Sequence, residues 1–320
     1  YVASRRTLDI LKYESNSKTI KTICQKDIKV NQQFLFDYQM ISEHRLWSFP
    51  NHMCQPVCYY DFNSGEFVEG KKIEKNNNML TRFSSSFESC YWSALYKTNK
   101  YFKYDLKQQN IKLYEISDKK MYAAAICFDG EYLWVSSSNN SEIYKCTKTG
   151  EVIGKFDGKG KAGGETFARL YAIDQYVIAV PRFGEFIFFI DKRTDEVKRF
   201  YLKDIDVRME MSPGKASKIL KCLKYKNKFV FFGFGIDAFI ILDMDDMEVR
   251  NIPIILSRED LEKINYANVV RNNVTVENET ICLKNLNKAI SHGNHENEKS
   301  NILNENQFGT VIYKMLIKGR

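Results

Sequence analysis

Two clusters of side chains in this sequence have the residue types that hold metal ions. His52, Cys54 and Cys58 form an H-x-C-x3-C pattern of soft nitrogen and sulfur ligands. Structural zinc sites usually take four such ligands, and no second pair follows nearby. Four carboxylates crowd a second segment, at Asp243, Asp245, Asp246 and Glu248. That segment lacks the longer, glycine-containing loop of calcium sites. We interpret both segments as turns between strands and expect no metal site.

A third pattern has the spacing of a phosphate-binding loop. Gly158, Gly160 and Gly163 match G-x-G-x-x-G, but that motif binds phosphate only between a strand and the N-terminus of a helix. The next segment, FARLYAI, is typical of a strand. We therefore predict a loop between two structural repeats and no nucleotide or other cofactor. Lys159 and Lys161 on this loop remain candidates for contact with an anionic ligand.

Catalytic residues are not identifiable from the sequence. The chain has four histidines, and only His44 and His52 lie near cysteines in the sequence, at Cys54 and Cys58. No further residue marks either thiol as a nucleophile. A pair of carboxylates acting on a glycoside is not excluded, because their separation in space cannot be read from a repeat sequence.

An internal repeat positions these residues. Trp47, Trp92 and Trp134 recur at intervals of 45 and 42 residues, each in a short aromatic run, and Ile178 and Phe231 continue the series at 44 and 53. A second apolar run follows each of them after a polar turn, and four of these runs end at Asp61, Asp105, Asp191 and Asp243. The runs are too short and too rich in aromatic and β-branched residues for helices. Each repeat therefore predicts four short strands in about 45 residues.

The predicted fold is an all-β, six-bladed β-propeller of four-stranded antiparallel blades. Five repeats are complete, and the N-terminal runs TLDILKY and KTIKTIC belong to a sixth that lacks its first strand. Residues 264–271 would supply that strand and close the ring, which removes free sheet edges. We assign residues 1–274 to the propeller and 275–320 to a C-terminal appendage, helical with a polar loop. Two further strands are the alternative for the appendage.

The repeat resembles the blades of NHL-like and kelch-like β-propellers. The segment 129–152, DGEYLWVSSSNNSEIYKCTKTGEV, and its four relatives carry this resemblance over roughly residues 1–272. The twin glycines of kelch blades and the Gly-His and Trp-Asp pairs of WD40 blades do not occur. The resemblance implies an architecture and leaves the function open.

Propellers of this kind bind ligands at one mouth of the central channel. Turns between the second and third strands of each blade share that face with the connections between blades. The candidate ligand-binding residues on these segments are Asn51, Lys97, Asn99, Asn139, Asn140, Arg182, Lys159 and Lys161. Their amides and cations would suit a polar or anionic ligand, although solvated turns have the same composition.

The composition limits the partners and the compartment. There are 48 basic and 40 acidic residues, a net charge of +8, and the lysines are scattered, so we expect no nucleic-acid binding. The apolar stretch 229–242 is interrupted by Asp237 and is too short to insert into a membrane. The eight cysteines lie mostly in strand-like runs, which favours free thiols and a cytoplasmic location. We expect a monomer.

These features favour a binding or scaffolding module over an enzyme. The partner would be a protein, a glycan or another anionic ligand. The alternative is a propeller lyase or hydrolase acting on a polar or sugar substrate at the channel mouth. A sensor domain from a longer protein is a third interpretation.

Overall fold

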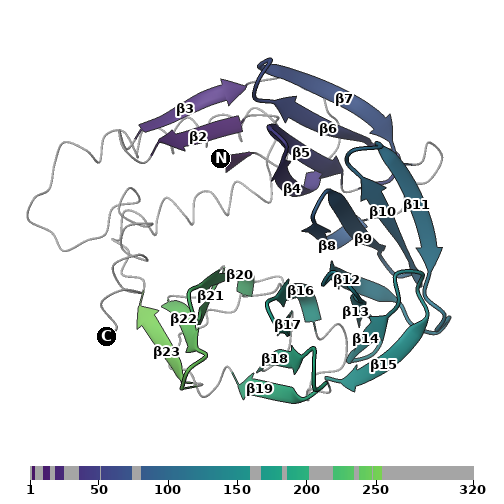
Figure 1. Ribbon diagram of the computed structural model, residues 1–320, viewed down its shortest axis with the longest axis vertical. Helices are drawn as coiled ribbons and strands as arrows, with labels where there is room; N and C mark the ends of the chain where they lie inside the picture. The colour runs from purple at the N-terminus through teal and green to yellow at the C-terminus, as the bar shows by residue number, and fades with distance from the viewer. Residues whose placement is uncertain are drawn as a thin grey trace, which may run out of the picture. The chain divides into compact units, whose positions relative to one another are not determined.

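Strands account for all the regular secondary structure that the computed structural model describes (Figure 1). It describes residues 2–3, 10–14, 19–24, 36–50, 52–73, 81–158, 167–181, 186–201, 219–233, 238–246 and 248–253. The chain divides into two units, one of Phe36–Pro253 and one of Tyr1–Leu35 with Ile254–Arg320.

The unit Phe36–Pro253 holds five four-stranded antiparallel sheets, each with its strands in chain order. The first comprises β4 (Phe36–Ser42), β5 (Arg45–Pro50), β6 (Pro56–Asp61) and β7 (Glu66–Lys72). The second comprises β8 (Thr81–Phe87), β9 (Cys90–Leu95), β10 (Lys100–Asp105) and β11 (Asn110–Glu115). The third comprises β12 (Ala123–Phe128), β13 (Leu133–Ser137), β14 (Glu142–Cys146) and β15 (Val152–Asp157). The fourth comprises β16 (Phe167–Ile173), β17 (Tyr176–Pro181), β18 (Phe186–Asp191) and β19 (Val197–Tyr201). The fifth comprises β20 (Ile219–Tyr225), β21 (Lys228–Gly233), β22 (Ala238–Asp243) and β23 (Val249–Pro253).

Strand register confirms the repeat that the sequence predicts. Each residue of the tryptophan series lies on the second strand of its sheet and faces a residue of the third strand. The pairs are Trp47 with Tyr59, Trp92 with Lys103, Trp134 with Lys145, Ile178 with Phe189, and Phe231 with Ile240. The five repeats are therefore equivalent in structure as well as in sequence.

Tight turns set this register. Four of the turns between first and second strands have two residues, and each contains a residue with positive φ, such as Glu88 (51°) and Asp174 (50°). Left-handed backbone in a two-residue turn matches the twist of the paired strands. In three of the five turns between third and fourth strands, an aspartate accepts the N–H groups two and three residues on, as Asp105 does from Lys107 and Gln108, both at 3.0 Å. The aspartates that end the predicted runs thus cap their turns.

Aromatic side chains pack between successive sheets of this unit. Phe49 of the first sheet stacks on Tyr91 of the second, with ring centres 3.6 Å apart. Trp92 of the second stacks on Phe128 of the third at 5.0 Å. First strands contact the first strands of the next sheet, from β4 through β8, β12 and β16 to β20. In Figure 1 these strands line the inner side of the unit and the fourth strands its outer side. A sheet with two apolar faces needs a neighbour on each side, and this arrangement supplies both neighbours for the second, third and fourth sheets.

The second unit has one described sheet of three antiparallel strands in the order β1 (Val2–Ala3), β2 (Ile10–Glu14) and β3 (Thr19–Cys24). It contains one strand fewer than the other five sheets. The predicted partner strand at 264–271 and the predicted appendage at 275–320 both lie outside the described residues.

Candidate binding surface

The turn between β13 and β14 and the connections between sheets lie on one face, as the sequence predicts. Ser138 in this turn donates its backbone N–H to the carbonyl of Tyr122, which precedes β12, at 2.6 Å. Ser141 in the same turn accepts the backbone N–H of Gly158, which follows β15, at 2.8 Å. The turn therefore contacts the connection that enters its sheet and the one that leaves it.

Asn139 fastens this turn to the incoming connection. Its side-chain oxygen accepts the backbone N–H of Tyr122 at 3.0 Å and the hydroxyl of Ser137 at 2.7 Å. Its amide nitrogen donates to the carbonyl of Lys120 at 2.8 Å. Asn139 thereby holds two backbone groups of the connection in fixed positions.

The turn between β9 and β10 is fastened to the same connection. Asn99 donates its side-chain amide to the carbonyl of Ile116 at 3.0 Å, and its own carbonyl accepts the N–H of Ile116 at 2.8 Å. The carbonyl of Thr98 accepts the N–H of Ala123 at 2.7 Å. Turns of the second and third sheets therefore both form hydrogen bonds to this connection, near its start at Ile116 and near its end at Tyr122.

Asn140, in the turn between β13 and β14, belongs to a separate hydrogen-bond network with Glu142 and Tyr144 of β14. Its amide nitrogen lies 3.0 Å from both Glu142 Oε2 and the Tyr144 hydroxyl, and that hydroxyl donates to Glu142 at 2.5 Å. Burial, together with the hydrogen bond to Glu142, raises the pKa of Tyr144. Tyr144 therefore stays protonated and acts here as a hydrogen-bond donor.

Four exposed side chains lie on the β9–β10 turn and on the connection between β11 and β12, which hydrogen bonds join. We call these residues the lysine patch: Lys97, Lys119, Lys120 and Tyr122. The Tyr122 side chain is 45% exposed, unusually open for an aromatic residue. The Lys97 ammonium lies 5.5 Å from the ring centre of Tyr96. The patch combines three cations with an accessible aromatic ring on an immobilised backbone.

Asp118, the carboxylate next to Lys119 in the sequence, forms an ion pair with a lysine outside the patch. Asp118 accepts the Lys155 ammonium at 2.7 Å, and this hydrogen bond holds the pKa of Asp118 below its ordinary value and raises that of Lys155. Because Lys155 offsets Asp118, the charges of Lys119 and Lys120 remain in excess.

Only one patch residue, Lys97, was among the predicted ligand-binding residues. Asn99, Asn139 and Asn140 bond to groups of the chain itself, and whether they also contact a ligand stays a prediction. Asn51, Lys159, Lys161 and Arg182 lie outside the described residues. Sequence reasoning missed Lys119, Lys120 and Tyr122, although the segment KKMY directly precedes the inner strand AAAICF.

The other predicted segments have structural explanations. Gly158 is buried, and a Cβ atom there would overlap the Phe167 ring and the carbonyl of Ser141, so packing requires glycine. Strand β16 is the next described element, as expected. In the acidic turn, Asp243 pairs with Lys228 at 2.5 Å and Asp246 with Arg250 at 3.1 Å. Within the described ranges, no three His, Cys, Asp or Glu side chains are placed to share a metal ion.

As predicted, the six cysteines that the structure describes in full form no disulfide bond: Cys54, Cys58, Cys90, Cys127, Cys146 and Cys222. Burial raises the pKa of Cys146 to about 12 and raises those of Cys127 and Cys222 as well. These three thiols are poor nucleophiles in the folded chain because they stay protonated.

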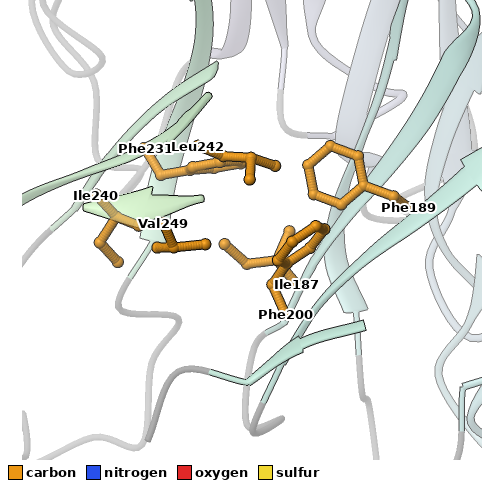
Figure 2. Close-up of a pocket in the computed structure, with 7 residues that line it drawn as sticks. All are labelled: Ile187, Phe189, Phe200, Phe231, Ile240, Leu242 and Val249. Atoms are coloured by element: carbon orange, nitrogen blue, oxygen red, sulfur yellow. The ribbon is translucent and has the colours of Figure 1, made fainter. Parts of the chain in front are cut away.

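An apolar gap separates the fourth and fifth sheets (Figure 2). Its lining is formed by Ile187, Phe189, Phe200, Phe231, Ile240, Leu242 and Val249. None of these side chains has a polar atom, so the gap belongs to the core between two sheets. The part of the chain that the structure describes contains no helix capable of crossing a lipid bilayer.

No protein-family model and no curated protein sequence matches the chain. Solved structures do match. Virginiamycin B lyase from Staphylococcus aureus aligns over 79% of this chain and 79% of its own, with a TM-score of 0.59 and 15% identity. A streptogramin B lyase aligns over 79% of this chain and 78% of its own, with a TM-score of 0.56 and 15% identity.

The chain has the β-propeller fold. A catalytically inactive variant of the Staphylococcus aureus lyase with quinupristin also matches this propeller, over 75% of each chain, with a TM-score of 0.53 and 15% identity. At this identity the likeness establishes the architecture and leaves the activity open.

Proposed function

We propose that this propeller is a binding module that holds an anionic ligand, on a glycan or a protein partner, against the lysine patch. The observation that carries the proposal is that the exposed side chains of Lys97, Lys119, Lys120 and Tyr122 belong to two chain segments that a backbone hydrogen bond joins. Lys97 lies in the turn between β9 and β10, and the other three lie in the connection between β11 and β12. The hydrogen bond from the Ala123 N–H to the Thr98 carbonyl joins these two segments, and Asn139 holds the connection in place.

The fixed backbone favours binding. A ligand that meets a preorganised surface orders fewer groups on association, so more of the contact energy appears as affinity. Three cations on neighbouring segments would also attract an anionic partner from a distance and raise its association rate. The ring of Tyr122 offers apolar area and a hydroxyl donor with little rotamer entropy to lose.

The test is a triple substitution, Lys97→Gln, Lys119→Gln and Lys120→Gln, with heparin oligosaccharide and poly-glutamate as separate probes. We expect at least one probe to bind the unchanged protein, and the triple variant to lose about tenfold in affinity, which is 1.4 kcal/mol. The unchanged protein should also bind more weakly at higher salt. Fluorescence anisotropy of labelled probes measures both effects.

The matched control removes the same charge elsewhere, by Lys107→Gln, Lys112→Gln and Lys148→Gln, three exposed lysines outside the patch. Equal losses in the two variants would mean that net charge alone attracts the probe, and the patch proposal would be wrong. Failure of both probes to bind the unchanged protein would also reject it.

The alternative is a propeller enzyme, a lyase or hydrolase at the channel mouth. The similar solved structures include lyases, one of them determined with quinupristin. Incubation of the chain with quinupristin, followed by mass spectrometry, separates the two proposals. Conversion of quinupristin would favour the enzyme, whereas recovery of intact quinupristin would remove this substrate from the alternative.

We further propose six blades, a monomer and a cytoplasmic location. Five complete sheets and the three strands β1–β3 support the blade count, if residues 264–271 complete the sixth sheet. Free thiols in the described part of the chain are consistent with a reducing compartment.

A further inference from the structure

Two buried polar atoms in the second sheet have no hydrogen-bond partner among the described residues. They are the indole nitrogen of Trp92 and the hydroxyl oxygen of Ser85. The Trp92 side chain is 3% exposed. A buried donor left without an acceptor costs about 1–3 kcal/mol, so native proteins rarely retain one.

The two atoms belong to one cross-strand pair. Ser85 on β8 faces Trp92 on β9 in the antiparallel register, so their side chains lie on the same side of the sheet. The Trp92 ring stacks on Phe128 of the next sheet, and the Lys103 ammonium lies 5.7 Å from its centre. The ring is therefore held in place, and its N–H cannot turn toward bulk water.

The third sheet shows how the repeat satisfies the same group. Trp134 occupies the equivalent position, and its indole nitrogen donates to Asp129 Oδ2 at 2.7 Å. Asp129 comes from the longer turn between β12 and β13. The β8–β9 turn has only two residues, Glu88 and Ser89, so no side chain takes the place of Asp129. Ser85 replaces Cys127, which faces Trp134 in the third sheet.

We propose that the Trp92–Ser85 pair forms a binding site for one buried water molecule. The water accepts the indole N–H of Trp92 and forms a hydrogen bond with the Ser85 hydroxyl. It is thus the acceptor for the indole, as Asp129 is in the third sheet. Buried waters typically sit where two or more otherwise unpaired polar groups converge. This site is independent of the lysine patch.

Nuclear magnetic resonance can test the site, because the chain has three tryptophans and hence three indole N–H signals. Trp92→Phe and Trp134→Phe variants assign two of them. We expect magnetisation transfer between water and the Trp92 indole proton, and none for Trp134, whose proton is bonded to a carboxylate. In Ser85→Ala the transfer at Trp92 should be lost.

Absence of the transfer in the unchanged protein would overturn the proposal. A transfer that persists in Ser85→Ala would remove Ser85 from the site and would overturn it in this form. If Ser85→Ala does not fold, Ser85→Cys reproduces the residue of the third sheet and gives the same readout. Far-UV circular dichroism checks that each variant is folded.

Discussion

Asparagine side chains on the candidate binding surface hold turns and connections together by hydrogen bonds. Asn99 and Asn139 carry both a donor and an acceptor, so each can bridge a strand turn to the backbone of a connection. The sequence indicates that both lie in turns between strands but does not distinguish an amide that contacts the backbone from one that faces a ligand. That distinction depends on contacts across 17 to 19 residues of sequence.

Replacing Asn139 with alanine should destabilise the chain by about 1–3 kcal/mol, because its side-chain hydrogen bonds to Tyr122, Ser137 and Lys120 are lost together. Asn110→Ala is the matched control, since that exposed amide bonds only to nearby Gln108 among the contacts described. Urea unfolding of both variants measures the difference. Equal stabilities would show that Asn139 does not fasten the turn.

The Asp118–Lys155 pair predicts a dependence on pH. The folded-state pKa of Asp118 is lowered by Lys155, so its stabilisation is present above the unfolded aspartate pKa of about 3.9 and disappears as the pH falls through the folded value. At neutral pH we expect Asp118→Asn to cost about 0–1 kcal/mol, because the pair is partly exposed. The difference should vanish in acid. Thermal melts of Asp118→Asn and the unchanged chain at neutral and acid pH measure this difference, and a difference that persists in acid would contradict the prediction.

At the scale of elements, turn residues couple one sheet to the next. Gly150, in the turn between β14 and β15, has a φ of 95° and accepts the backbone N–H of Ser117, which follows β11, at 2.9 Å. A polar residue followed by glycine, here Thr149-Gly150, is typical of such a turn in a sequence. The sequence did not reveal that the turn rests on the preceding sheet.

Gly150→Ala should therefore destabilise the chain by more than about 1 kcal/mol, since alanine is strained at positive φ. Its Cβ atom would also overlap the Glu115 carbonyl oxygen. Gly154→Ala is the control, because the nearest atom to a Cβ there is Lys145 Cβ at 3.5 Å. Chemical denaturation compares the two, and a similar loss in both would mean that neither the positive φ of Gly150 nor the contact to Glu115 sets the cost.

Much of the element pattern was readable from the sequence, because tryptophan spacing and terminal aspartates report strand position directly. Contacts between sheets were not readable. The Tyr101 hydroxyl donates to the Lys148 carbonyl at 2.9 Å across 47 residues, and Lys145 pairs with Asp195 at 2.7 Å across 50 residues. No local periodicity encodes such pairs, since each partner has an ordinary place in its own hairpin.

At the scale of the molecule, each sheet depends on its neighbours for packing. Lys145 illustrates this, because it lies 4.8 Å from the Tyr132 ring in its own sheet and pairs with Asp195 in the next. A row of such sheets has two ends, and ring closure would join them. The proposed closing strand at 264–271 is therefore the feature on which the stability of the whole array would depend.

Val269→Pro tests this closure. Proline removes a ladder hydrogen bond and is disfavoured inside a sheet, so we expect a loss of about 3 kcal/mol or more if 264–271 completes the sixth sheet. Ser291→Pro, in the segment predicted to be a polar loop, is the control and should change the melting temperature little. Similar melting temperatures for Val269→Pro and the unchanged chain would argue against closure by this segment.

The order in which the buried cysteines are alkylated during unfolding reports the order in which the sheets separate. Cys58, Cys127 and Cys222 lie in β6, β12 and β20, which belong to three different sheets. Alkylation requires both access to the sulfur and formation of the thiolate, and packing between the sheets withholds both from Cys127 and Cys222. Each cysteine therefore reacts only after its own sheet has separated, so the order in which the three positions become modified is the order in which the sheets come apart.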